Sequence, residues 1–145
     1  MTFVPESLRT VSALGQVSSS INYRLARNAA VEDVHQGRVM PEDACDAHSE
    51  LVRAAANVGE RAKEECPVCL SDELRLVSYA FGKRLPPGGR CLSSKKELSR
   101  LSQSVSEITC YVVEVCPSCS WHHLSRRFSV GGRKLPSAAG RGGAR

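Results

Sequence analysis

The sequence predicts an α+β protein in which a helical hairpin precedes a small antiparallel module and a disordered basic tail. Apolar residues repeat with helical spacing before residue 60, strand-like alternation follows it, and one short cysteine motif occurs twice. These patterns favour four parts. They are a flexible lead-in at 1–19, the helical hairpin at 20–59, the antiparallel module at 60–130 and a flexible basic tail at 131–145.

The first helix is expected over residues 21–35. Three serines directly before it offer capping oxygens, and Ile21, Leu25 and Ala29 follow at intervals of four. Gly37 comes just after the last periodic residue, where glycine commonly ends a helix.

A second helix is expected to begin at Pro41, because proline suits the first helical position. Gly59 is the expected C-terminal stop. Paired antiparallel, the two helices would bury Leu25 and Leu51. The apolar stripe that predicts the second helix consists of Ala44, Ala47, Leu51, Ala54 and Val58.

The module after residue 60 is expected to contain three strands and one short helix. Residues 82–90 hold two prolines and three glycines, so they predict a loop. Ser94 and Glu97 form the capping box of a short helix that continues with Leu98, Leu101 and Val105. The expected strands cover residues 74–81, 108–115 and 121–130, and the first has Val77, Tyr79 and Phe81 on one face.

Two copies of a Cys-Pro-x-Cys motif are the strongest signal in the chain. Cys66 and Cys69 form one pair, Cys116 and Cys119 form the other, and 46 residues separate the inner cysteines. Two thiolates separated by two residues can bind one ion, and two such pairs close a tetrahedral site typical of structural zinc. We therefore expect zinc as the cofactor and a zinc-ribbon-like module around it.

A redox dithiol is the main alternative, since Cys-Pro-x-Cys also occurs in thioredoxin-like enzymes. There the first cysteine opens a helix, whereas here each pair adjoins an expected strand and the motif is repeated. A closed four-thiolate site leaves no position for a catalytic water. Together with the lack of a serine triad order or phosphate loop, this predicts a protein that is not an enzyme.

The net charge of +5 is concentrated near the C-terminus. Residues 126–145 carry six basic and no acidic side chains, and the remaining chain has 14 basic against 15 acidic residues. The tail is expected either to contact phosphates or simply to keep the protein soluble. No apolar run is long enough to span a membrane and no secretory signal is evident, so we expect a cytoplasmic protein.

A candidate binding surface follows the second cysteine pair. It consists of Trp121, His122, His123, Arg126 and Arg127, an aromatic and cationic set suited to phosphate or an acidic partner. In the alternative reading, Trp121 caps the small core and the others are solvated. The favoured function is docking on nucleic acid or on a nucleic-acid machine such as RNA polymerase or the ribosome. The alternatives are a protein adaptor acting through the helical hairpin and a thiol redox protein.

Cys45 and His48 lie three residues apart in the expected second helix and could supply two further metal ligands. No partner pair is evident beside them, and Cys45 adjoins the apolar stripe, which favours a small buried residue. Cys110 is expected in the core and Cys91 in a loop without a role.

Eight short runs between about residues 20 and 130 mix charged, aromatic and small residues. They are Tyr23-Arg24-Leu25-Ala26-Arg27, Gly37-Arg38-Val39, Cys45-Asp46-Ala47-His48, Ala54-Ala55-Ala56-Asn57-Val58-Gly59-Glu60, Cys66-Pro67-Val68-Cys69, Tyr79-Ala80-Phe81-Gly82, Tyr111-Val112-Val113-Glu114-Val115-Cys116 and Trp121-His122-His123-Leu124. Together they resemble an uncharacterised family of small actinobacterial proteins, a domain of unknown function. The resemblance implies a helical start followed by a zinc-ribbon-like part, and it implies no activity.

Overall fold

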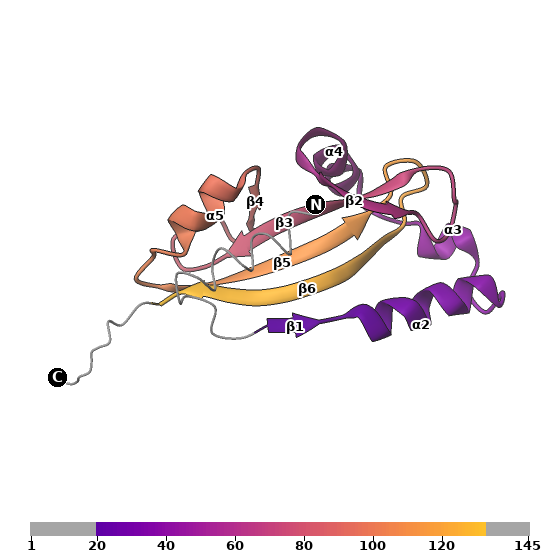
Figure 1. Cartoon of the computed structure of the whole chain (residues 1–145), viewed down its shortest axis with the longest axis horizontal. Coiled ribbons are helices and arrows are strands. Elements are labelled where there is room, and N and C mark those ends of the chain that lie inside the picture. Colours follow the sequence, from indigo (N-terminus) through magenta and orange to yellow (C-terminus); the bar gives the residue numbers. More distant parts are fainter. Residues whose placement is uncertain (1–19, 133–145) are drawn as a thin grey trace.

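A computed structural model of the chain describes residues 20–132, so the expected lead-in and residues 133–145 of the expected tail lie outside the described residues. The described part confirms the α+β class, with a six-stranded antiparallel sheet and four helices (Figure 1). Its elements are β1 (Ser20–Asn22), α2 (Arg24–His35), α3 (Pro41–Ala44), α4 (Ser49–Val58), β2 (Glu60–Glu65), β3 (Glu73–Phe81), β4 (Arg90–Leu92), α5 (Lys95–Leu101), β5 (Glu107–Val115) and β6 (His122–Gly131).

The centre of the sheet is built from β3, β5 and β6, which confirm the three expected strands to within one residue at each end. The strand order is β1-β6-β5-β3-β2, and β4 also pairs with β3. Tyr79 pairs with Tyr111, which pairs with Arg127 on the next strand. Since directly paired residues point to the same side of a sheet, these three share one face.

The opposite face carries the main core. The register places Ala80, Cys110 and Phe128 side by side on it. The short helix α5 contributes its buried Leu98 to the same cluster. Burial of this aliphatic cluster supplies much of the hydrophobic stabilisation of the described part. Its fully or nearly buried members are Leu76, Ala80, Leu92, Leu98, Ile108, Cys110, Val112, Phe128 and Val130.

The capping box before α5 is confirmed in a slightly shifted form. The Ser94 hydroxyl accepts a hydrogen bond from the Glu97 amide at 3.2 Å, as expected. The Glu97 carboxylate, however, accepts from the amide of Ser93 at 3.0 Å instead of that of Ser94. The helix ends at Leu101, so Val105 lies beyond it and is 84% exposed.

The second helix is not continuous from Pro41 to Gly59, and this prediction is wrong. Residues 45–48 interrupt it, leaving the single turn α3 and the ten-residue α4. His48 ends the break in an extended conformation, and its Nδ1 accepts a hydrogen bond from the Glu50 amide at 3.0 Å. This ring thus caps α4, which explains why the helix restarts there.

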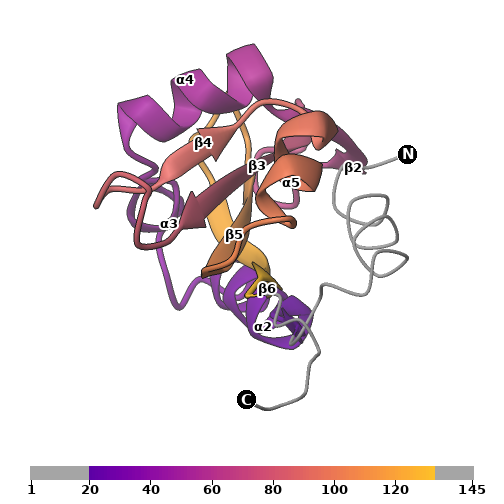
Figure 2. The same ribbon diagram turned by 90° about the vertical axis from the view of Figure 1, so that its left-hand side faces the viewer.

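The helical hairpin is not confirmed. Figures 1 and 2 show α2 and α4 far apart, with α4 against β3 and β5 and α2 beside β6. Arg27 and Val31, one turn apart, are the buried residues of α2, whereas Leu25 is 85% exposed. The expected burial of Leu25 against Leu51 is therefore wrong. Leu51 instead packs beside Val77 on the sheet.

Two strands were not expected from the sequence. The edge strand β2 has the sequence Glu-Arg-Ala-Lys-Glu-Glu, and alternate side chains are exposed. Charges on an edge strand discourage pairing with other chains, but they also hide the strand from hydropathy patterns. Lys63 has a φ of 59°, where the register of β2 with β3 shifts. The three-residue β4 begins at Arg90, the last residue of the expected loop.

The first strand, β1, pairs with β6 on the opposite edge from β2. Residues 20–22 were expected at the helix start, but α2 begins only at Arg24, whose amide donates to the Asn22 side chain at 2.7 Å. The sheet thus takes strands from both sides of residue 60. The domain boundary expected at this residue, between the helical hairpin and the antiparallel module, stays a prediction.

None of the helices within residues 20–132 has the length and hydropathy to cross a bilayer.

Candidate metal centre

The structure brings all four predicted ligand cysteines together. Their sulfur atoms lie within 4.8 Å of one another. Cys66 approaches Cys119 to 3.7 Å, and Cys69 approaches Cys116 to 3.6 Å. Four sulfurs bound to zinc at about 2.3 Å would be separated by about 3.8 Å along each tetrahedral edge. The two closest separations match this edge, so the four sulfurs could hold a metal ion.

The two cysteine loops have matching backbone hydrogen bonds. The amide of Leu70 donates to the carbonyl of Cys66 at 3.1 Å, and the amide of Ser120 donates to that of Cys116 at 3.0 Å. Leu70 and Ser120 both adopt the left-handed conformation, with φ values of 57° and 73°. A non-glycine residue rarely adopts this conformation. Its occurrence at the same position of both loops indicates that the two loops share one specific backbone geometry around the cysteines.

Backbone amides also point at the sulfurs. In each loop the amide two residues after a cysteine donates to its sulfur, an arrangement that stabilises thiolates. These donors are Val68 to Cys66 at 3.4 Å, Ser71 to Cys69 at 3.5 Å, Ser118 to Cys116 and Trp121 to Cys119.

Cys69, Cys116 and Cys119 differ in their affinity for protons. Burial raises the pKa of Cys69, but hydrogen bonds from the hydroxyl and amide of Ser71 outweigh it and leave that pKa at about 6. Burial raises the pKa of Cys116 to about 11 and raises that of Cys119 as well. Because a metal binds the thiolate, protons compete with the ion for Cys116 and Cys119.

A side-chain contact ties the two loops to each other. Asp72, which follows the first pair, accepts a hydrogen bond from the hydroxyl of Ser118 at 2.8 Å. The same bond is the main reason why the pKa of Asp72 is lowered. The first loop also receives a hydrogen bond from α2, since His35 Nε2 donates to the carbonyl of Pro67 at 2.8 Å.

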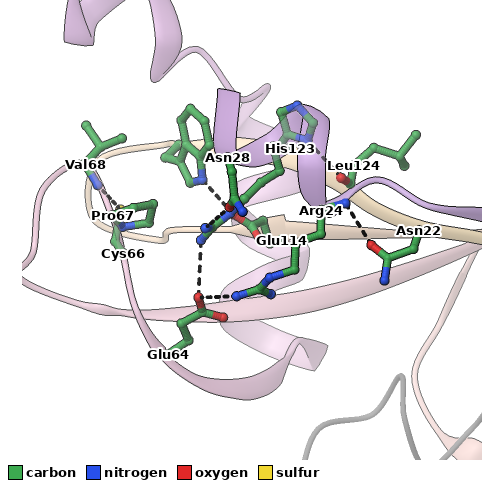
Figure 3. Close-up of polar contacts among 12 residues, drawn as sticks. Asn22, Arg24, Asn28, Glu64, Cys66, Pro67, Val68, Glu114, His123 and Leu124 are labelled. Atoms are coloured by element: carbon green, nitrogen blue, oxygen red, sulfur yellow. Dashed lines mark hydrogen bonds and ion pairs between the residues drawn. The ribbon is translucent and has the colours of Figure 1, made fainter. Parts of the chain in front are cut away.

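A buried ion pair supports the second loop. Arg27 of α2 and Glu114 of β5 are each 7% exposed, and their Nε and Oε2 atoms are 2.8 Å apart. The same carboxylate oxygen accepts a hydrogen bond from Trp121 Nε1 at 2.9 Å. Figure 3 shows Glu114 in this network and Glu64 bridging two arginine side chains, at 3.5 Å from Arg27 and 3.7 Å from Arg24.

The Cys45–His48 break between α3 and α4 lies against the second cysteine loop. Cys45 Sγ is 3.6 Å from Cys119 Sγ. The amide of Ala47 donates to the carbonyl of Ser120 at 3.0 Å, and Asp46 Oδ1 is 2.9 Å from His122 Nε2. Cys45 is thus a fifth thiol beside the cluster, whereas His48 faces α4.

The face of the sheet opposite the main core is open beyond α4. It forms a groove of about 980 Å³, with half-buried aromatic side chains from β3 and β5. Phe81 and Tyr111 meet edge to face, with ring centroids 5.5 Å apart. The groove is lined by His48, Glu50, Leu51, Tyr79, Phe81, Gly88, Thr109, Tyr111, Val113, His122, His123 and Leu124.

The five predicted binding residues do not form one surface. Trp121 is 2% exposed and stacks on His123 at a centroid distance of 6.1 Å, which fits the reading in which it caps the core. Arg126 pairs with Val112 on the core face, and its Nε is buried. His122 lines the open groove, and Arg127 lies on the same face as Tyr111.

The groove's aromatic side chains were only partly foreseen. Tyr79 and Phe81 were expected on one face of a strand, but Tyr111 was not assigned a role. The alternation of Tyr111 and Val113 with buried Val112 was the available signal.

Comparisons with known proteins extend the sequence resemblance. Uncharacterised proteins of Mycobacterium tuberculosis and Mycobacterium bovis are 36% identical to the chain over 126 residues, covering 86% of this chain and 92% of theirs. No solved structure matches the chain. The model of a family of unknown function, DUF5318, matches residues 15–143. The chain therefore belongs to the DUF5318 family.

Proposed function

We propose that the protein is a non-enzymatic zinc-binding protein that docks on single-stranded nucleic acid. The nucleic acid is either free or part of a machine such as RNA polymerase or the ribosome. In this proposal the zinc site is structural, and the open sheet face is the docking surface. The observation that carries the docking is the aromatic groove beside Arg127.

The structural role of zinc is supported by the ligand set. Cys66, Cys69, Cys116 and Cys119 supply four sulfurs, which fill a tetrahedral site and leave no open position for a reacting water. Bound zinc would join the start of β3 to the turn between β5 and β6, as in a zinc-ribbon-like module. Such a site contributes on the order of 10 kcal/mol to folding.

Docking on nucleic acid is supported by the chemistry of the groove. Tyr79, Phe81 and Tyr111 are half-buried on one face of an antiparallel sheet, and unpaired bases stack on aromatic side chains presented in this way. Arg127 pairs with Tyr111 in the register and forms no ion pair with any residue from 20 to 132, so its charge is available for a phosphate. Glu50, the acidic residue of the groove, is 3.2 Å from Arg53.

Substitution of Tyr111 tests this proposal. With a labelled single-stranded RNA of about 12 nucleotides as probe, fluorescence anisotropy should show that Tyr111→Ala weakens binding. Loss of one stacking contact worth about 1 to 3 kcal/mol corresponds to about 5- to 150-fold in the dissociation constant. Tyr111→Phe keeps the ring and should bind like the wild type. Arg127→Ala should reduce the slope of log affinity against log salt by about 1.

The same titration separates the alternatives. Equal RNA affinity of Tyr111→Ala and wild type, with zinc content and melting temperature unchanged, would exclude the groove as the docking surface. No binding of wild type to RNA or single-stranded DNA at low salt would overturn nucleic-acid docking. A partner protein retained from cells at high salt would then favour the adaptor function, because an apolar interface is insensitive to salt.

A further inference from the structure

The fifth cysteine at the metal centre has no place in the proposed four-sulfur site. Cys45 Sγ is as close to Cys119, at 3.6 Å, as the four cluster sulfurs are to their nearest neighbours. A tetrahedral ion takes four of the five sulfurs, and Cys45 is the one that is not within 4.8 Å of all the others. Cys45 therefore remains a free thiol in contact with a metal ligand.

This contact is fixed by the backbone and by a neighbouring side chain. Ala47 donates its amide to the carbonyl of Ser120, and Asp46 is 2.9 Å from His122, so two residues that follow Cys119 hold the Cys45 segment in place. Forming a disulfide would require the two sulfurs to approach each other by about 1.5 Å. Both thiols are only partly buried, so small oxidants have access to them.

We propose that Cys45 and Cys119 form an oxidation site. Hydrogen peroxide or a related peroxide joins the two cysteines in a disulfide, and zinc is released. This inference rests on the proposed zinc site. It concerns a covalent modification of the chain and is independent of what the groove binds.

The oxidation balances with peroxide as the two-electron oxidant. One thiol sulfur attacks the O–O bond and becomes a sulfenic acid, and the first water is released. The Cys119 thiolate then attacks this sulfur, so that an S–S bond forms, the S–O bond and the Cys119–zinc bond break, and hydroxide leaves and takes a proton from solvent to become the second water. Two cysteine sulfurs are oxidised by two electrons in total, and one peroxide is reduced to two waters. Cys119 can no longer serve as a thiolate ligand.

The other cysteines compete poorly for this reaction. Cys110 is fully buried in the core, and Cys91 lies across from Tyr79 on a different part of the sheet. Cys66, Cys69 and Cys116 are ligands of the ion like Cys119, but Cys119 is the ligand whose sulfur lies 3.6 Å from the Cys45 sulfur. Cys45 is thus the one thiol of the described residues that contacts the cluster without belonging to it.

The experiment treats the zinc-loaded full-length chain with hydrogen peroxide. Zinc release is followed with a chromogenic chelator, and the remaining thiols are alkylated before disulfides are mapped by tandem mass spectrometry. Wild type should yield a Cys45–Cys119 disulfide and release zinc. Cys45→Ser should form no such bond and release zinc several-fold more slowly. Cys91→Ser, a change at another partly buried cysteine, should behave like the wild type.

The outcomes separate this inference from the proposed function. A protein that holds zinc, but releases it equally fast in wild type and Cys45→Ser, would overturn the inference and leave the zinc site intact. So would mapping of the disulfides within the Cys66–Cys69 or Cys116–Cys119 pair. A protein that binds no zinc would overturn the proposed function, and disulfide mapping would still decide whether Cys45 pairs with Cys119.

Discussion

Replacing Cys66 with serine is expected to abolish zinc binding and to leave the chain largely unfolded at room temperature. Cys66 is fully buried, and its sulfur is one of the four that fit the ion. A structural zinc site contributes on the order of 10 kcal/mol to folding. That is comparable with the entire stability of about 5 to 15 kcal/mol of an ordinary domain. Zinc content and circular dichroism of the purified variant measure the effect.

Cys91→Ser is the matched control for this substitution. Cys91 is partly buried on β4 and pairs with Tyr79, away from the cluster. It should keep zinc and melt close to the wild-type temperature. Equal zinc content and equal melting for Cys66→Ser and Cys91→Ser would contradict a structural role of the four-cysteine cluster.

The second large effect is expected at Glu114. Glu114→Ala leaves the buried guanidinium of Arg27 without its nearest carboxylate and Trp121 Nε1 without its acceptor. Removing one partner of a buried ion pair costs about 3 to 5 kcal/mol, because the remaining charge stays buried and unpaired. Urea denaturation of the zinc-loaded protein should show a decrease of this size in the free energy of unfolding.

Glu64→Ala provides the comparison for Glu114→Ala. Glu64 contacts the same Arg27, at 3.5 Å, but its side chain is 41% exposed. Ion pairs with an exposed partner contribute about 0 to 1 kcal/mol, so this variant should unfold close to the wild type. If Glu114→Ala cost no more than Glu64→Ala, the buried pair would not support the second cysteine loop as described.

The central strands and the cysteine cluster could be predicted because their signals are local. Alternating apolar residues identify β3 and β5, and a repeated Cys-Pro-x-Cys motif fixes both the ligand type and the spacing. The capping box at Ser94 likewise depends on residues only three positions apart. In each case the signal lies within one short stretch of chain or, for the cysteines, in two copies of one short motif.

The parts that were missed depend on contacts distant in sequence. The helical spacing from Ala44 to Val58 favours one helix, but docking of Ala47 on Ser120 interrupts it. The stripe of α2 suggests that Leu25 is buried, whereas the salt bridge of Arg27 with Glu114 turns the other side of the helix inward. A charged residue at a buried position cannot be foreseen from hydropathy.

Trp121 shows the same limit for the candidate binding site. As the single tryptophan beside two histidines and two arginines, it was compatible with an exposed aromatic contact and equally with a cap on the core. Its indole is instead buried and donates to Glu114. The open aromatic face comes from Tyr79, Phe81 and Tyr111, which meet only once β3 and β5 pair.

The metal content of the protein tests the central claim most directly. The full-length chain, purified under reducing conditions without added metal, should contain one zinc ion per chain by elemental analysis. X-ray absorption should then show four sulfur neighbours at about 2.3 Å. A protein without zinc, or zinc with oxygen or nitrogen neighbours in place of sulfur, would contradict the four-cysteine site formed by Cys66, Cys69, Cys116 and Cys119.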